Sequence, residues 1–141
     1  MAAFEHRLRV RFQHCDPAGI IFFSNVLVYC HEAYEELLRS GGTPLEAIIQ
    51  ERARSLPIGH AEATFKRPIR HGQLVLVRTT VGRLGDRSFR LEYDLFDEAQ
   101  EHLATAATVH VSVDPATMRS TAVTGPLRAL LEKYVQPAPA G

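Results

Sequence analysis

A single carboxylate stands between a polar, strand-like segment and a run of apolar residues, in the sequence HCDPAGIIFFSN at positions 14–25. Asp16 is followed by Pro17 and Gly19, and the next four residues are Ile, Ile, Phe and Phe. A carboxylate can attack a carbonyl carbon as a nucleophile or activate a water molecule as a general base. The alternative role is that of a turn-initiating aspartate, because Asp, Pro and Gly are common in turns. The apolar run favours chemistry on a hydrophobic reactant.

Two other groups of residues have the right types for chemistry. Cys15 would need a base to form a thiolate, and its neighbour His14 is expected on the opposite face of a strand. His31 and Glu32 begin the helical segment HEAYE, which differs from the zinc-binding pattern H-E-x-x-H because Glu35 stands at the second histidine position. We therefore expect neither a metal nor another cofactor.

The periodicity of the apolar residues predicts the elements that must position Asp16. Predicted strands cover residues 5–13, 56–65, 74–83, 88–96 and 102–113, and a terminal helix covers 127–134. A long helix is expected to begin after Ser24 or Asn25, to run for roughly four turns, and to stop at Gly41–Gly42. A second, short helix has Thr43 as its expected N-cap and ends near Arg54.

The order of these elements predicts the fold class. A strand, a long helix, a short helix and four further strands are typical of an α+β domain. Consecutive strands with short connections imply antiparallel pairing, so we expect one five-stranded antiparallel sheet wrapped around the long helix. Residues 1–141 are expected to form a single domain with a flexible tail at 136–141. Exposed sheet edges in so small a domain favour pairing with a second copy.

The composition argues against several classes of protein. The 16 basic residues balance 16 acidic ones, so no global positive field points to nucleic acid. The N-terminal sequence MAAFEHRLRVRF lacks the apolar stretch of a signal peptide, and no apolar run approaches the ~18 residues of a membrane span. Cys15 and Cys30 are too few for a disulfide framework. We expect a cytoplasmic protein that binds neither nucleic acid nor membranes.

The segment Asp16-Pro17-Ala18-Gly19-Ile20-Ile21, with Asn25 and the long helix behind it, resembles the hotdog-fold thioesterases of the 4-hydroxybenzoyl-CoA thioesterase type. The resemblance extends to the element order of about the whole chain. It implies hydrolysis of an acyl-CoA thioester, with an aromatic or short-to-medium acyl group, to the free acid and CoA. Asp16 matches the essential carboxylate of the family, acting as nucleophile or general base.

The chemistry of a thioester also predicts which groups should surround this carboxylate. The carbonyl oxygen becomes an oxyanion on attack, and free N–H groups at a helix N-terminus can stabilise that charge. The backbone amide of Phe23 or its immediate neighbours is the expected donor. Gly19 would permit a positive φ angle or a close approach of the backbone.

Further residues are expected to contact the substrate. In hydroxybenzoyl-specific members of the family a helix carboxylate meets the substrate phenol, and His31 occupies that position here, followed by Glu32. This chain therefore departs from the hydroxybenzoyl-specific pattern. Asn25 in the motif and His60 near the middle of a predicted strand are additional candidates.

The resemblance also implies how CoA would be held. Arg87 and Ser88 match a basic residue and a serine at the start of the family's fourth strand. Together with the basic segment KRPIRH at 66–71, Arg87 would contact the CoA phosphates, which arginine can bind bidentately. The family implies a homodimer or homotetramer whose active sites lie at the subunit interface.

Two other functions remain compatible with the same fold. A hotdog dehydratase or isomerase would need a histidine and an acid that reach the α and β carbons of the acyl chain. A non-catalytic acyl-CoA-binding protein would use the same groove without releasing CoA. Hydration of crotonyl-CoA identifies the first alternative, and tight product binding without thiol release identifies the second.

Overall fold

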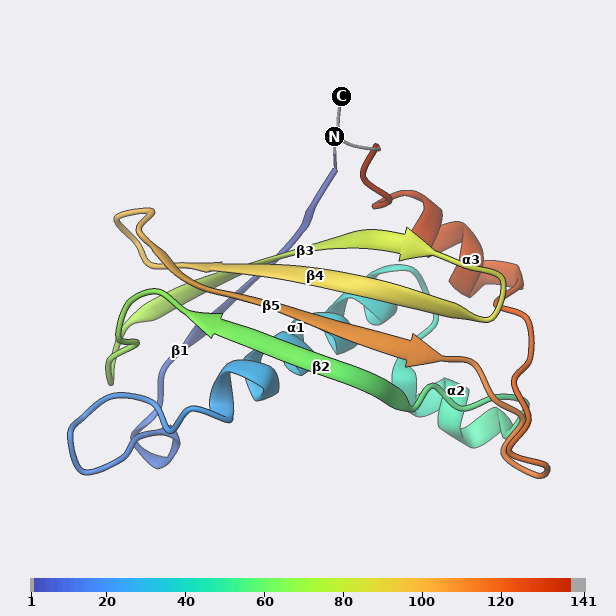
Figure 1. The fold of residues 1–141 in the computed structure, drawn as a ribbon, viewed down its shortest axis with the longest axis horizontal. Coiled ribbons are helices and arrows are strands. Elements are labelled where there is room, and N and C mark those ends of the chain that lie inside the picture. Colours follow the sequence, from blue (N-terminus) through green and yellow to red (C-terminus); the bar gives the residue numbers. More distant parts are fainter. Residues whose placement is uncertain (1, 138–141) are drawn as a thin grey trace.

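The computed structural model describes residues 2–137 and shows one antiparallel sheet with a long helix against it (Figure 1). The strands are β1 (Phe4–Arg9), β2 (Ile58–Phe65), β3 (Leu74–Leu84), β4 (Ser88–Phe96) and β5 (His102–Val111), in the spatial order β1-β3-β4-β5-β2. The helices are α1 (Asn25–Ser40), α2 (Leu45–Glu51) and α3 (Gly125–Glu132). The predicted α+β class, with five antiparallel strands and one long helix, is confirmed.

The core lies between α1 and the sheet. The buried side chains of α1 are Val26, Tyr29, Cys30, Ala33, Tyr34, Leu37 and Leu38. They form one stripe because residues three and four positions apart share a face of a helix. Alternate residues of β3 and β4, such as Val77 and Leu91, are fully buried opposite this stripe. Each buried leucine or valine stabilises the fold by roughly 1.5 to 3 kcal/mol relative to exposure, so α1 is firmly held against the sheet.

The pairing of β2 differs from the expectation that consecutive strands pair. Strand β2 pairs with β5, and Phe65 lies opposite Ala104, whereas β3 pairs with β1 and β4. The connection between β2 and β3 is too long for a hairpin, and it carries Ile69 and Arg70 past the loop that precedes α1. The connection takes the chain from β2 across the sheet to β3, which lies next to the opposite edge strand, β1. Strand β2 is therefore an edge strand.

The first strand is shorter than predicted. Strand β1 ends at Arg9, and residues Phe12–His14 form a 3-10 turn in place of the expected continuation to residue 13. The backbone N–H of Arg11 donates to Nδ1 of His14 at 3.1 Å, which closes the turn locally. Phe12 continued the alternating pattern in the sequence, but its side chain is exposed.

The helix ends also show where local signals were misleading. The hydroxyl of Thr43 donates to the carbonyl of Leu38, so Thr43 satisfies the end of α1 and makes no side-chain cap for α2. Helix α2 ends at Glu51 rather than near Arg54, because Arg52 is left-handed with φ 55°. Of the predicted tail, Gln136 donates its backbone N–H to Val81, and residues 138–141 lie outside the described residues. None of the described helices is long and apolar enough to cross a lipid bilayer.

Candidate active site

The loop that carries Asp16 is a tight turn between the 3-10 turn and α1. Its ends are joined by the bridge between Cys15 and Ile21. Inside it, the N–H of Asp16 donates to the carbonyl of Ile20 at 2.9 Å, and the N–H of Gly19 donates to the carbonyl of Asp16 at 3.0 Å. The carboxylate oxygen Oδ1 of Asp16 accepts the N–H of Ala18 at 2.8 Å. The backbone therefore fixes both the position of Asp16 and the orientation of its carboxylate.

Gly19 is required by the shape of this loop. Its φ angle is +80°, which residues other than glycine rarely adopt. A Cβ atom at this position would meet nothing within 4 Å, so the torsion angle and not crowding explains the glycine. The carbonyl of Gly19 accepts the N–H of His71 at 3.0 Å, and Ile21 donates to the carbonyl of Ile69 at 2.8 Å. These bonds dock the loop onto the β2–β3 connection.

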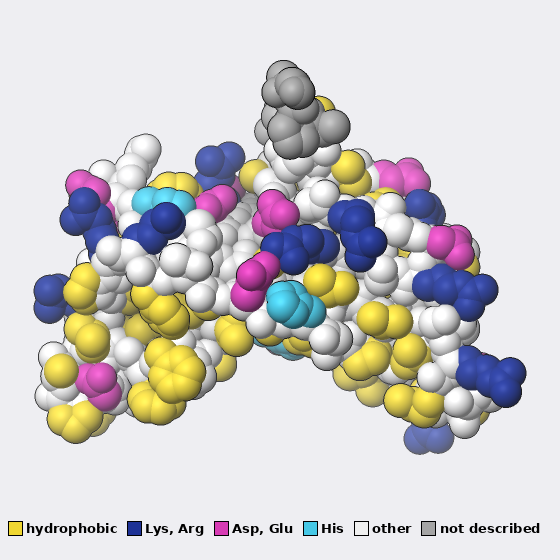
Figure 2. Space-filling model, viewed as in Figure 1, with side chains coloured by type: hydrophobic (Ala, Val, Ile, Leu, Met, Phe, Trp, Pro, Cys, Tyr) yellow, Lys and Arg dark blue, Asp and Glu magenta, His cyan; other side chains and the backbone are white. Residues whose placement is uncertain are grey.

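Asp16 stands at an apolar cavity of about 490 Å³. The other lining residues are Ile20, Ile21, Phe22, Phe23, Phe65, Lys66, Arg67, Pro68 and Ile69. Figure 2 shows hydrophobic side chains gathered at the lower left, over the loop that Figure 1 draws before α1. Phe22 and Phe23 are 53% and 64% exposed, and adjacent exposed apolar side chains of this size are typical of surfaces that bind a ligand or a partner.

The start of α1 offers unused hydrogen-bond donors beside this cavity. Among residues 2–137, the backbone N–H groups of Phe23 and Ser24 have no hydrogen-bond acceptor. Ser24 occupies the N-cap position without a side-chain hydrogen bond to the helix, so it does not occupy these donors. Free N–H groups at a helix N-terminus carry partial positive charge and bind anions or developing oxyanions.

The turn geometry of Asp16 does not by itself identify a catalytic residue. Asp114 is followed by the same residues, Pro115 and Ala116, and its Oδ1 also accepts the N–H of the alanine at 2.8 Å. Both side chains are partly buried. Only Asp16 stands at an apolar cavity and near the free N–H groups of a long helix. The surroundings, and not the hydrogen bond to the alanine N–H, distinguish the two carboxylates.

The predicted residues on α1 lie near this loop, and the contacts of their side chains are with the protein itself. The side-chain amide of Asn25 donates to the carbonyl of His14 at 2.8 Å. His31 is half-buried and its Nδ1 lies 3.2 Å from Oε2 of Glu35. Glu32 is exposed and its Oε2 lies 2.5 Å from Nε2 of His6. Among the described residues, no three His, Cys, Asp or Glu side chains gather as a metal site requires.

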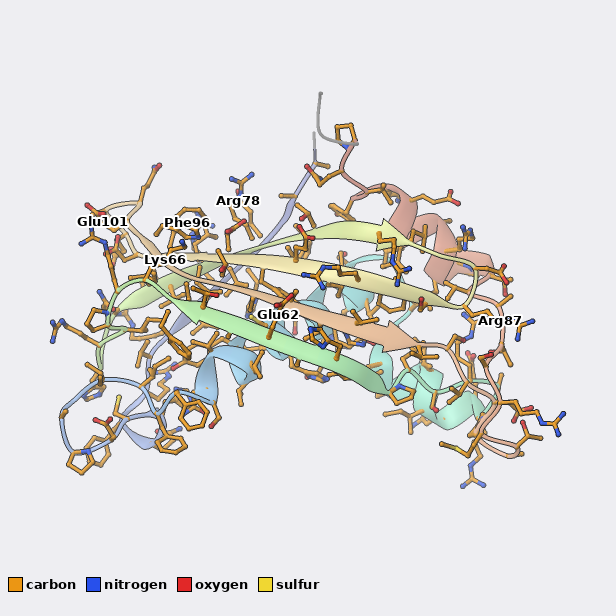
Figure 3. All side chains as sticks on the ribbon, in the orientation of Figure 1. Glu62, Lys66, Arg78, Arg87, Phe96 and Glu101 are labelled. Atoms are coloured by element: carbon orange, nitrogen blue, oxygen red, sulfur yellow. The ribbon has the colours of Figure 1, made fainter. Side chains whose placement is uncertain are left out.

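The residues expected to hold CoA divide into two groups, because Lys66 lines the Asp16 cavity whereas Arg87 lies far from it within one chain. Figure 3 shows Lys66, which lines the cavity, and Arg87 at opposite ends of the sheet. Arg87 donates to Ser120 and lies beside Asp86, and the adjacent Ser88 begins β4. His60 is exposed on β2, with its Nε2 3.8 Å from a carboxylate oxygen of Glu62. One chain therefore does not bring Arg87, Ser88 or His60 to the carboxylate.

Two residues that line the cavity, Phe65 and Ile69, have no signal in the sequence that points to this site. Both lie about fifty positions after Asp16 in the chain, and no spacing rule connects them to it. Phe65 was visible only as the last residue of a predicted strand. Its exposure of 49% at the mouth of the cavity is a property of the folded chain.

Comparisons with known proteins agree with this architecture. Residues 10–138 match the family model of the thioesterase-like superfamily. The chain is 31% identical over 142 residues to a 1,4-dihydroxy-2-naphthoyl-CoA hydrolase of Picosynechococcus, covering 97% of this chain and 94% of the relative. It is 35% identical over 115 residues to the protein of that name from Nostoc punctiforme, covering 82% of this chain and 77% of the relative.

Solved structures give the same result. A 1,4-dihydroxy-2-naphthoyl-CoA thioesterase from Synechocystis superposes with a TM-score of 0.89 at 28% identity, covering 96% of this chain and all of the other. A gentisyl-coenzyme A thioesterase superposes with a TM-score of 0.81 at 26% identity, covering 90% and 98% of the two chains. The five-stranded antiparallel sheet around one long helix is thus the hotdog fold, and the expected hotdog-fold thioesterase superfamily is confirmed. The expected 4-hydroxybenzoyl-CoA type is not confirmed, because the relatives named here are dihydroxynaphthoyl- and gentisyl-CoA thioesterases. This chain belongs to the thioesterase-like superfamily and is a hotdog-fold thioester hydrolase.

Proposed function

We propose that this enzyme hydrolyses aromatic acyl-CoA thioesters and that Asp16 is its catalytic carboxylate. The observation that carries the proposal is the placement of Asp16 at the apolar cavity beside the free N–H groups at the start of α1. A hydrophobic acyl group would fill the cavity, and its thioester carbonyl would lie between the carboxylate and the N–H of Phe23.

Two reaction routes are compatible with this arrangement. As a nucleophile, Asp16 attacks the carbonyl carbon, the CoA thiolate leaves and is protonated, and water then hydrolyses the mixed anhydride. As a general base, Asp16 accepts a proton from the attacking water, and the departing sulfur is protonated as the C–S bond breaks. Both routes produce one carboxylic acid and one CoA thiol. In both, the N–H of Phe23 donates to the oxyanion, where a lost donor typically costs ~10² to 10³ in turnover.

The lining of the cavity supports an aromatic acyl group. The rings of Phe22, Phe23 and Phe65 stand at its walls, and aromatic rings prefer offset or edge contacts with other rings. The relatives named above act on dihydroxynaphthoyl and gentisyl thioesters, so a hydroxylated aryl-CoA is the first choice. The dihydroxynaphthoyl group is favoured over 4-hydroxybenzoyl, because His31 stands where the hydroxybenzoyl-specific enzymes have a carboxylate.

We propose that a second copy of the chain completes the site. Seven of the eight β2 residues are exposed, and an edge strand presents unpaired N–H and C=O groups. Ile58 and Phe65, at its two ends, are 44% and 49% exposed. A strand of this length spans about 23 Å, at ~3.3 Å per residue. Two β2 strands related by a two-fold axis pair antiparallel, so the Ile58 end of one meets the Phe65 end of the other.

This pairing would bring together CoA-binding residues that lie far apart within one chain. Arg87 lies at the Ile58 end of the sheet, because Ser88 pairs with Val111 on β5 and Ile58 pairs with His110. In the dimer, Arg87 of the partner subunit would approach the Asp16 cavity, where Lys66 already lies. CoA would then be held by basic residues from both copies. The dimer is the smallest such assembly, and a tetramer would combine two of them.

We also propose a cytoplasmic location, which the state of the cysteines supports. Cys15 and Cys30 are both free thiols. Burial raises the pKa of the Cys30 thiol to about 12, which makes it unreactive. Neither cysteine therefore gives a reason to expect an oxidising compartment.

The test is a panel of CoA thioesters with detection of free thiol. The panel contains 1,4-dihydroxy-2-naphthoyl-, 4-hydroxybenzoyl-, benzoyl- and short aliphatic acyl-CoA. We expect the fastest release from an aryl-CoA and a loss of ~10² to 10⁴-fold in kcat for Asp16→Asn. Asp114→Asn is the matched control, since it removes a carboxylate from the same Asp-Pro-Ala turn, and it should keep full activity. Unchanged turnover in Asp16→Asn would remove Asp16 from the mechanism.

A further inference from the structure

His14 holds the two ends of the Asp16 loop through its backbone carbonyl. That carbonyl accepts the N–H of Phe22 at 2.9 Å and the side-chain amide of Asn25 at 2.8 Å. Phe22 ends the loop, and Asn25 begins α1. One atom of His14 therefore joins the loop that carries Asp16 to the helix start near the N–H of Phe23.

The Nδ1 atom of the His14 imidazole lies within hydrogen-bond distance of two donors. Nδ1 lies 3.1 Å from the backbone N–H of Arg11 and 3.0 Å from the hydroxyl oxygen of Tyr29. A backbone N–H can only donate, so Nδ1 is an acceptor and the ring carries its proton on Nε2. The two rings also meet edge to face, with centroids 5.3 Å apart and planes at 73°.

Tyr29 is a rigid support for this contact. It lies in the second turn of α1 and is 1% exposed. Burial, followed by the nearby Cys15 and Glu32, raises the pKa of Tyr29 to about 12. The hydroxyl thus keeps its proton at neutral pH and can donate to Nδ1 of His14. The hydrogen bond links α1 to the residue that fixes the loop.

Neither His14 nor Tyr29 is among the described residues that line the Asp16 cavity. They lie instead in a cleft of about 380 Å³ on the β1 side of α1, together with Arg7, Arg9 and Glu32 among others. Any effect of the pair on catalysis must therefore act through the position of the loop and not through contact with the acyl group.

We propose that Tyr29 and His14 are positioning residues that hold the Asp16 carboxylate against the oxyanion donor at Phe23. The inference rests on the proposed function of Asp16. Displacement of a reacting group by about 1 Å can cost ~10²-fold in rate. Removing the Tyr29 hydroxyl or the His14 acceptor therefore lowers kcat, while KM, which depends on the cavity and the CoA contacts, changes little.

The experiment compares Tyr29→Phe, His14→Leu, their double variant and His14→Asn, with the best substrate of the panel. We expect kcat per folded active site to fall about 10- to 100-fold in Tyr29→Phe and His14→Leu, with KM within about twofold. The double variant should lose no more than His14→Leu alone, because the contact of the Tyr29 hydroxyl is already absent from His14→Leu. His14→Asn places an acceptor oxygen near the position of Nδ1 and should restore most of kcat.

Tyr93→Phe is the matched control. It removes another buried tyrosine hydroxyl, which bonds Thr108 in the core, and it should lower stability without changing kcat per folded site. If Tyr29→Phe keeps kcat within twofold of the wild type, or if Tyr93→Phe loses as much, the positioning role is wrong. The activity of Asp16→Asn separates the catalytic role of Asp16 from the positioning role of Tyr29 and His14. An inactive Asp16→Asn beside a fully active Tyr29→Phe refutes only the positioning role.

Discussion

The imidazole of His110 lies flat on the ring of Phe89, with centroids 4.9 Å apart and planes 7° apart. His110 is 1% exposed, and the ring of Tyr34 lies on it at 4.4 Å. Its Nε2 is 2.9 Å from the hydroxyl of Thr108. A cationic imidazole would be poorly solvated there, and burial lowers the pKa of His110 to about 4, with a smaller lowering from the nearby His31.

This burial predicts a loss of stability in mild acid. In the unfolded chain the pKa of His110 is about 6.5, so the neutral core histidine contributes its full stability above that pH and loses it as the pH falls toward 4. Between pH 7.5 and pH 5 the loss amounts to about 2 kcal/mol. His110→Phe removes this titration and keeps a ring against Phe89. Denaturant unfolding should show the wild type losing this much more than the variant over that range, and equal losses would contradict the assignment.

Thr108 should be one of the most sensitive polar residues in the core. Its hydroxyl lies 2.9 Å from both the hydroxyl of Tyr93 and Nε2 of His110. Thr108→Val leaves two buried polar groups without this partner, each costing about 1 to 3 kcal/mol. We expect a loss of about 2 to 4 kcal/mol in the free energy of unfolding. Thr108→Ser keeps the hydroxyl and should lose about 1 kcal/mol from the missing methyl. Similar losses in both variants would show that the hydrogen bonds contribute little.

Gly19 should be sensitive because of its backbone conformation. Gly19→Ala places a Cβ at φ +80°, which costs about 1 to 2 kcal/mol for an L-residue, and Gly19→Asn should cost less because asparagine tolerates this region. Both variants should lower kcat, since the loop carries Asp16. Gly42→Ala is the control, because it places a Cβ at φ +77° in open space after the end of α1, so it should lose similar stability and keep kcat. A Gly19→Ala enzyme with native stability and kcat would show that the loop adapts freely.

The dimer proposal can be tested on the edge of β2. Ala61→Glu adds a carboxylate near the middle of β2 on each copy, and like charges that face each other across paired strands are destabilising. We expect the variant to shift toward monomer in sedimentation and to lose activity as it dissociates. Ala99→Glu, on the exposed β4–β5 turn, changes the charge equally and should stay assembled. A fully assembled, active Ala61→Glu would exclude β2 as the interface.

Much of this protein could be predicted from local patterns. Alternation and helical periodicity located the strands and α1, because the side chains of each element point to a buried face with a fixed period. The residue types of the Asp16 segment predicted a turn before a helix, and the structure has that turn, with Gly19 at positive φ. These features depend on interactions between residues close in the chain, so a single sequence contains the information.

Other features depend on contacts between distant residues, and only the tertiary structure decided them. The Asp-Pro-Ala residues and their side-chain hydrogen bond do not distinguish Asp16 from Asp114, since both aspartates have them. The Gly19 and the apolar run after Asp16 do differ from the residues after Asp114, but they do not show which residues would surround the carboxylate. The difference arises because β2 pairs with β5 and its exit carries Phe65 and Ile69 to the Asp16 loop. The cavity exists only where these segments meet. The neighbours that Asp16 acquires on folding, and not its own turn, make it the candidate catalytic group.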